Sequence, residues 1–403
     1  TYDGARGVAQ RRGSRRNSNL GNDEMISYYI SLSNAMGAGN VRAVKALEYF
    51  GNAKNIFKSS AEKRAQSGIF TANELKRLEA MGPDYANEIA AECKANGIDI
   101  IQLGDKRYPR CLSVLEDAPV VVYVKGRLPD FDRTPAICIV GPRKVTEKGK
   151  IAAYSVARRA ALAGMTVVSG GALGCDSAAH YGAVKAGGDT ALVMGCGILS
   201  DYLPENRPLR NLVESHGCLI SEYPPHYRAS RYTFPVRNRI LSGLALCTVV
   251  IEAGSKSGAL ITARHAAEQG KDVFVIPGDG SKAYAGSNAL LDDGAIPLND
   301  MSDIFNEYIP RFPDKINIKR AYERTHSEHK NAEDLSVHKK LSNETLSKNA
   351  KIVYNHLDKH KFYPEEIKDT GLEPSEIISA LTELEIELII RSAPGGRYEL
   401  INK

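Results

Sequence analysis

Short apolar runs alternate with alanine-rich segments through the middle of the chain. The apolar runs are Val120–Val124, Ala136–Val140, Thr166–Val168, Ala191–Met194, Cys247–Ile251 and Val273–Ile276. Most are separated by segments of helical composition, namely Ile151–Ala163, Ser177–Ala186 and Ala259–Gln269. Strands that are apolar throughout and alternate with helices are typical of a parallel sheet covered on both faces. The pattern therefore predicts an α/β fold over residues 101–305, a doubly wound, Rossmann-like parallel sheet.

The regions on either side of this domain differ from it in composition. At 403 residues the chain is too long for one ordinary core, so several domains are expected. Residues 1–22 are rich in Gly, Arg, Ser and Asn, which predicts a disordered basic tail, and the polar stretch 306–348 is typical of a linker. Apolar residues at helical spacing predict a helical domain over 23–100. Three helical segments and a hairpin predict a winged helix over 349–403.

A Gly-x-Gly turn separates two of the expected N-terminal helices, at Gly37 and Gly39. Such a turn can direct backbone N–H groups at a phosphate, as in a helix-hairpin-helix contact with DNA. It can equally be a plain turn in which glycine supplies a positive φ. The sequence leaves both interpretations open.

Net charge does not by itself indicate an anionic partner. The whole chain carries +5, but residues 1–20 hold five arginines against one aspartate, so the remainder sums to only +1.

Seven cysteines are scattered without metal-ligand spacing, which favours reduced thiols in a cytoplasm and predicts no metal. We expect no membrane segment, because no run approaches the roughly 18 apolar residues needed, and no secretory signal.

Glycine-rich segments follow nearly every predicted strand. In a doubly wound sheet these segments meet at the carboxyl ends of the strands, where ligands bind. Glycines there let the backbone approach phosphate closely, which suits a nucleotide, a phosphosugar or a nucleic-acid backbone. Neither the G-x-G-x-x-G fingerprint nor a P-loop occurs among them. We therefore predict no nucleotide cofactor.

Arginines and aromatic residues are interleaved between Tyr223 and Ile251, a stretch without Asp or Glu. Its members are Arg228, Arg231, Arg237, Arg239, Tyr227, Tyr232 and Phe234, with Asn238 between the last two arginines. Arginine neutralises backbone phosphate and aromatic faces stack on bases, so the mixture favours single-stranded nucleic acid. The alternative is a structural loop whose arginines pair with Asp176, Glu222 and Glu252.

Two further features allow a catalytic or a DNA-reading interpretation. Asp176 and His180 are spaced one helical turn apart, and a carboxylate near a phosphosugar pocket could assist hydrolysis of an N-glycosidic bond. Asp176 could instead cap its helix.

The predicted winged helix has a net charge of −3, from seven basic and ten acidic residues over 349–403, and its expected recognition helix contains Glu376, Glu383 and Glu385. A helix of this charge would repel DNA, so a protein-contact or accessory role is favoured.

Several motifs fall in order along the central domain. They are Tyr108-Pro109, Asp117-Ala118-Pro119, Gly141-x-Arg143, Ser169-Gly170 with Asp176 and His180, Ser221-Glu222-Tyr223-Pro224, Phe234-Pro235-x-Arg237-Asn238-Arg239, Ser257-Gly258-x-Leu260-x-Thr262-Ala263 and Pro277-Gly278. Together they resemble the bacterial DNA-processing protein A (DprA/Smf) family, with SAM-like and winged-helix appendages at the two ends. Pro142 and Gly171 depart from the usual pattern of that family.

The resemblance implies a function that composition does not. It predicts a non-catalytic protein that binds single-stranded DNA, loads the RecA recombinase, protects incoming DNA in natural transformation and forms a homodimer through its Rossmann-like domain. It also implies that Arg143 contacts phosphate, that Arg231 and Phe234 line the strand path, and that Arg237 and Arg239 shape the pocket. The complete predicted DNA-binding set is Gly141, Arg143, Ser169, Gly170, Arg231, Phe234, Arg237, Asn238, Arg239, Lys256, Ser257 and Gly258.

The alternatives are a nucleotide-sugar (phosphoribo)hydrolase on the same glycine-rich segments and a winged-helix transcription factor. The run Pro-Gly-Gly-x-Gly-Thr-x-x-Glu of related hydrolases is absent, because Gly254–Ala263 lacks its glutamate. The acidic recognition helix disfavours the transcription factor.

Overall fold

The computed structural model describes residues 24–322, 346–357, 361–386, 389–393 and 397–400. The predicted tail 1–22 and most of the predicted linker lie outside these ranges. The chain forms two compact units, and the boundaries between these units differ from the boundaries of the predicted domains. The first consists of the chain up to Lys125 with Gly195–Ser200 and Ile220–Val236, and the second of the remainder. Among the described residues, no helix is both long and apolar enough to cross a bilayer.

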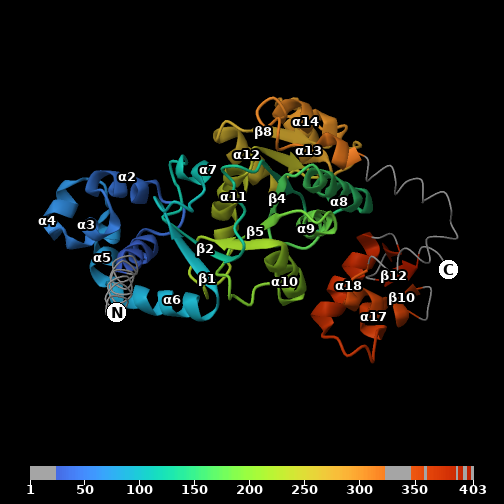
Figure 1. Cartoon of the computed structure of the whole chain (residues 1–403), viewed down its shortest axis with the longest axis horizontal. Helices are drawn as coiled ribbons and strands as arrows, with labels where there is room; N and C mark the ends of the chain where they lie inside the picture. Colours follow the sequence, from blue (N-terminus) through green and yellow to red (C-terminus); the bar gives the residue numbers. More distant parts are fainter. Residues whose placement is uncertain (1–23, 323–345, 358–360, 387–388, 394–396, 401–403) are drawn as a thin grey trace, which may run out of the picture. The chain divides into compact units, whose positions relative to one another are not determined.

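The first unit is mainly helical before its two strands (Figure 1). Residues 24–36 are helical, and α2 (Val41–Phe50), α3 (Ala53–Lys58), α4 (Ala61–Gln66), α5 (Ala72–Ala80) and α6 (Pro83–Ala95) follow. Polar side chains cap most of these helices, so their starts are fixed locally. The antiparallel strands β1 (Ile98–Gln102) and β2 (Val121–Gly126) flank the short α7 (Arg110–Ser113).

The turn before α2 has the geometry of a helix–helix connection. Gly37 and Gly39 have φ angles of 81° and 67°, which glycine adopts without strain. The Asn40 side chain accepts a hydrogen bond from the Arg42 amide, which caps α2. The Gly39 amide donates to the Glu222 carboxylate at 3.2 Å. The chain's own carboxylate therefore uses an amide that a phosphate contact would require, which favours the plain turn.

The second unit contains a run of parallel strands. These are β3 (Ala136–Val140), β4 (Thr166–Ser169), β5 (Thr190–Met194), β7 (Cys247–Val250), β8 (Asp272–Val275) and β9 (Ile296–Pro297). With β6 (Gly217–Ser221), the full order of the nine-stranded sheet is β1-β2-β6-β5-β4-β3-β7-β8-β9. Every residue of β3, β4, β5 and β7 is buried. The prediction of a large, mostly parallel α/β sheet is confirmed.

Helices connect these strands as the alternation predicts. They are α8 (Glu147–Leu162), α9 (Cys175–Lys185), α10 (Arg207–His216), α11 (Thr233–Leu244), α12 (Ala259–Glu268), α13 (Ala285–Asp292) and α14 (Met301–Tyr308), with a 3₁₀ turn η1 (Pro204–Asn206). Alanines and glycines on α8 and α9 allow close packing, and the Gly182 position has no room for a Cβ because the Tyr154 carbonyl would lie 2.3 Å away.

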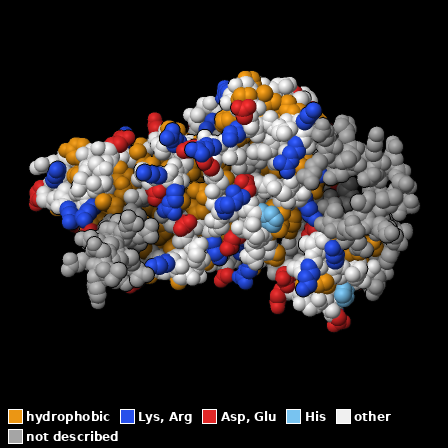
Figure 2. Space-filling model, viewed as in Figure 1, with side chains coloured by type: hydrophobic (Ala, Val, Ile, Leu, Met, Phe, Trp, Pro, Cys, Tyr) orange, Lys and Arg blue, Asp and Glu red, His pale blue; other side chains and the backbone are white. Residues whose placement is uncertain are grey.

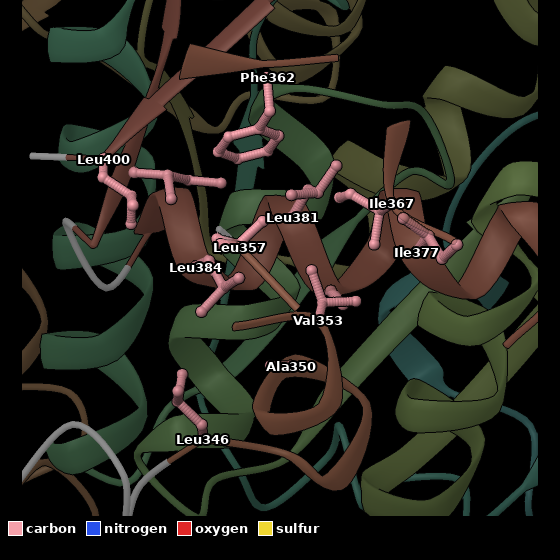
Figure 3. Packing of buried hydrophobic residues seen from close by; sticks show 12 residues of the cluster. Leu346, Ala350, Val353, Leu357, Phe362, Ile367, Ile377, Leu381, Leu384 and Leu400 are labelled. Atoms are coloured by element: carbon pink, nitrogen blue, oxygen red, sulfur yellow. The ribbon is translucent and has the colours of Figure 1, made fainter. Parts of the chain in front are cut away.

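The C-terminal segment, residues 346–400, has a core of its own (Figure 3). Its elements are α17 (Lys348–Asn355), β10 (Lys361–Phe362), the 3₁₀ turn η2 (Pro364–Glu366), α18 (Pro374–Ile386), β11 (Ile390–Ala393) and β12 (Arg397–Leu400). The strands form an antiparallel sheet of order β10-β12-β11. Val353, Leu381 and Leu384 are almost completely buried between these elements. The winged-helix assignment stays a prediction.

Candidate nucleic-acid interface

The strand order reverses direction between β3 and β7. From β3 the chain continues to β4 and β5 on one side, whereas from β7 it continues to β8 and β9 on the other. The two strands are parallel neighbours, so the loops that follow them leave the sheet together. Ligands of doubly wound proteins bind at such a switch point. The candidate site is therefore built on the β3–α8 loop (residues 141–146) and the β7–α12 loop (residues 251–258), which we call the rim.

A buried carboxylate ties the two rim loops together. Glu252 is only 2% exposed and accepts hydrogen bonds from the Thr146 amide at 3.1 Å and the Thr146 hydroxyl at 2.8 Å. Thr146 also caps α8, because its Oγ1 accepts from the Gly149 amide at 3.0 Å. A side chain at Gly149 would collide with the Glu252 carboxylate. The alternative interpretation of the sequence paired Glu252 with an arginine, but its hydrogen-bond partner in the structure is Thr146.

The β4–α9 loop (residues 170–174) packs against the β3–α8 loop. The Cys175 amide donates to the Pro142 carbonyl at 3.3 Å. Gly174 has a φ of 79°, and a Cβ there would lie 2.3 Å from the Arg143 carbonyl oxygen. A Cβ on Gly141 would lie 2.6 Å from the Cys175 sulfur. The glycines of the predicted site therefore set how closely these loops approach one another.

Beneath these loops, Asp176 and His180 are buried. Burial raises the pKa of Asp176 to about 6, although nearby Arg237 and the Ala172 amide favour its charged form. Burial lowers the pKa of His180 to about 4, so its ring is neutral at pH 7. The ring nitrogens lie 2.9 Å from the Gly170 carbonyl oxygen and 2.7 Å from the Thr190 hydroxyl. Both side chains are used within the fold.

Three of the predicted DNA contacts on α11 are buried as well: Arg237, Asn238 and Arg239. The Arg237 guanidinium donates to the Val193 carbonyl and, at 3.1 Å, to the Asn238 amide oxygen. It also lies beside Asp176, because a Cβ on Gly170 would approach both groups within 3 Å. Arg237 thus follows the alternative interpretation, in which an arginine lies beside a buried carboxylate within the fold.

Ser169 is also inaccessible, since its hydroxyl donates to the Ile139 carbonyl at 2.7 Å in the core. These buried side chains can shape the rim but do not lie on its surface. Asn238 contacts the rim directly, because its side-chain amide donates a hydrogen bond to the Gly258 carbonyl at 3.4 Å.

Exposed cations lie on the rim. Arg143 and Lys144 are exposed on the β3–α8 loop, and Lys256 is exposed on the β7–α12 loop. Ser257 lies next to Gly258, whose Cα faces open space. The carboxylates Asp176 and Glu252 are buried below. Figure 2 shows Lys and Arg side chains interspersed with Asp and Glu on the visible face, so this local arrangement matters more than overall charge.

The remaining two predicted residues, Arg231 and Phe234, belong to the first unit. Arg231 is exposed, and its guanidinium carbon lies 4.7 Å from the centre of the Tyr232 ring. Tyr232 is 67% exposed and Tyr227 is 50% exposed. Phe234 is half-buried against Gly195, whose Cβ would lie 2.7 Å from the ring. The two tyrosines were absent from the predicted site, although their alternation with arginine in the sequence indicated them.

The fold and the rim define an α/β protein of the doubly wound class, with its ligand position at the β3–β7 switch point. The model of the family DNA recombination-mediator protein A matches residues 99–309. The chain belongs to this family, as the sequence motifs predicted.

Relatives with known names agree with this assignment. The chain is 36% identical to DNA processing protein DprA of Bacillus subtilis over 220 residues, which are 54% of this chain and 74% of the relative. It is 30% identical to Protein Smf of Synechocystis over 294 residues, or 68% of this chain and 74% of the relative. The X-ray structure of DprA from Streptococcus pneumoniae superposes with a TM-score of 0.61 at 31% identity, covering 70% of this chain and 97% of that one.

Proposed function

We propose that the protein binds single-stranded DNA on the rim and acts without catalysis as a recombination mediator. The observation that carries the proposal is the exposure of Arg143, Lys144 and Lys256 on two loops at the switch point, above carboxylates that are buried. Cations and main-chain amides at such a position suit a chain of phosphates. Family membership supports the same substrate class.

Preference for single strands rests on the exposed aromatic residues of the first unit. Tyr227 stacks on Tyr223 and the Arg231 guanidinium lies over the Tyr232 ring, but both tyrosines are largely exposed, so an unstacked base can lie against the remaining surface of each ring. Stacking of bases on aromatic side chains is available to single strands and not to an intact duplex. We include Arg231, Tyr232 and Phe234 in the proposed strand path. We assign Ser169, Gly170, Arg237, Asn238 and Arg239 to shaping the rim from below.

A non-catalytic role is supported by the state of the groups that a hydrolase would use. Asp176 and His180 are buried and hydrogen-bonded within the fold. Burial also raises the pKa of the Cys175 thiol well above its ordinary value, which disfavours a nucleophilic thiolate. Incubation with nucleoside monophosphates should release no free base; release of base would favour the phosphoribohydrolase.

The wider role follows from the family. We propose that the protein loads RecA onto single-stranded DNA, protects incoming DNA in transformation and works as a homodimer through its Rossmann-like domain. RecA-dependent strand exchange on DNA coated with single-strand-binding protein should accelerate when the protein is added, and sedimentation should report a dimer.

The rim assignment is tested by fluorescence anisotropy with a labelled oligonucleotide. Arg143→Ala and Lys256→Ala should each weaken binding, and each should reduce the slope of log K against log salt by about 0.7, the value expected for one lost phosphate contact on a single strand. Arg311→Ala is the matched control, because Arg311 is exposed, pairs only loosely with Glu307 at 3.8 Å and lies outside the rim. Equal binding by all three variants and the wild type would place the site elsewhere.

A further inference from the structure

The acidic helix α18 of the C-terminal segment is docked on α8 and α9 of the same unit. The Glu383 carboxylate pairs with Lys185 of α9 at 3.1 Å, and the Glu385 carboxylate pairs with Lys150 of α8. One turn earlier on both α18 and α9, the Tyr181 hydroxyl lies 2.6 Å from the Ser379 hydroxyl. Two of the acidic side chains of the expected recognition helix are thus paired with lysines of the same unit.

We propose that this docking is an electrostatic cover, in which the α18 carboxylates hold cations that DNA phosphates would otherwise bind. The proposal rests on the proposed function of the rim and adds its regulation. Carboxylate and phosphate oxygens are both anionic acceptors for lysine, so the two groups compete for the same ammonium.

Lys150 is placed to take part in such a competition. It lies in the first turn of α8, which begins directly after the β3–α8 loop that bears Arg143 and Lys144. Lys148, in the same turn, is exposed. The Glu385 side chain is 3% exposed and covers Lys150, which is 13% exposed. If α18 leaves, Lys150 joins the exposed cations next to the rim.

The docked contact brings two carboxylates close together. Two carboxylates share Lys150, since Glu147 also lies 3.6 Å from its ammonium. Burial and the neighbouring Glu385 raise the pKa of Glu147, because both disfavour its charged form. Undocking separates Glu385 from Glu147. The apolar side chains of α18, such as Leu381 and Leu384, face the segment's own core and stay buried there (Figure 3).

Packing at the contact is also incomplete. A cleft of about 600 Å³ lies between α9, α10 and the segment, and polar side chains line it, among them Arg207, Asn211 and Glu376. Permanent interfaces are more apolar and are packed as densely as protein interiors. A polar contact beside an open cleft is typical of domains that move relative to one another.

The test compares two ways of breaking one ion pair. Glu385→Gln and Lys150→Gln both remove the pair, but only the first leaves a cation for DNA. The double variant Glu383→Gln, Glu385→Gln removes both ion pairs. Glu383→Gln keeps a side-chain oxygen that can accept the hydrogen bond from the amide of Ser347, the N-cap residue of α17. Glu307→Gln, at an exposed pair, is the matched control. Hydrogen exchange of α18 and of the first turn of α8 reports docking, and anisotropy reports DNA affinity.

We expect faster exchange in both elements for the double variant, a higher affinity for single-stranded DNA and a salt dependence of log K that is steeper by about 0.7, the value for one added phosphate contact on a single strand. Lys150→Gln should speed exchange similarly with a smaller gain in affinity. Unchanged exchange in the double variant, or faster exchange with no gain in affinity, would overturn the proposal. Absence of DNA binding in wild type and all variants would refute the proposed function, while the exchange data would still decide whether the ion pairs hold the segment.

Discussion

A neutral histidine at the base of the β4–α9 loop offers a direct check on the structural interpretation of the rim. His180 is fully buried and contacts the Gly170 carbonyl and the Thr190 hydroxyl. Its pKa is lowered by burial to about 4, below the ordinary value of 6.5. A catalytic acid or base would instead reach solvent or substrate and titrate near neutral pH.

The depressed pKa makes a stability contribution whose sign and size can be stated. The folded protein favours the neutral ring, so the contribution is complete above pH 6.5 and is lost as the pH falls toward 4. Each pKa unit corresponds to about 1.4 kcal/mol, so the whole contribution is about 3 kcal/mol. Most of it is lost by pH 4.5. Asp176, whose pKa is raised, contributes with the opposite pH dependence.

The assay is urea unfolding of the wild type and His180→Gln at pH 7 and pH 4.5, followed by circular dichroism. Gln can still donate to the Gly170 carbonyl, and Asp176 is present in both proteins, so its titration largely cancels in the difference. The destabilisation caused by His180→Gln should shrink by about 2–3 kcal/mol between the two pH values. A difference that stays constant with pH would mean that His180 has an ordinary pKa, and the buried, structural role would be wrong.

Two further variants test the loop geometry and the strand path. Gly174→Ala should lower the free energy of unfolding by at least about 2 kcal/mol, because alanine is strained at this positive φ and its Cβ collides with the Arg143 carbonyl. Gly187→Ala is the control, because Gly187 has a similar φ of 68° but no atom within 4 Å of an added Cβ. It should lower the free energy of unfolding by about 1 kcal/mol. Equal losses for the two variants in urea unfolding would contradict the close approach at Gly174. Tyr232→Ala should weaken single-stranded DNA binding by about 1–2 kcal/mol in anisotropy, whereas the exposed Tyr49→Ala should not, and identical affinities would remove Tyr232 from the strand path.

The sheet could be predicted from sequence because its strands are buried on both faces. Apolar runs such as Ala136–Val140 and Cys247–Val250 have no polar side that would confuse the pattern. Strand order could not be predicted in the same way, since β3 and β7 pair across more than a hundred residues. The position of the switch point, and therefore of the rim, needed the structure.

The site could be predicted only as a set of loops. Residue type indicates that an arginine is available for phosphate but not which face of the fold it occupies. Arg143 lies in a loop and is exposed, whereas Arg237 lies on α11 and is drawn into the core beside Asp176. The two residues are 61 positions apart in the sequence, so no local pattern reveals that they lie close together. The partner of Glu252 was likewise a backbone amide and a threonine hydroxyl, not an arginine.

The most direct test of the central claim is to map where a single strand lies on the protein. Ultraviolet crosslinking of a thymidine oligonucleotide to the full chain, followed by peptide mass spectrometry, identifies the contact residues. The account predicts crosslinks in peptides that contain the β3–α8 loop with Arg143 and the β7–α12 loop with Lys256, suppressed by unlabelled single strands far better than by duplex. The segment with Arg231 and Tyr232, which the account places on the strand path, should crosslink as well. Crosslinks found neither in the two loops nor in this segment would contradict the account.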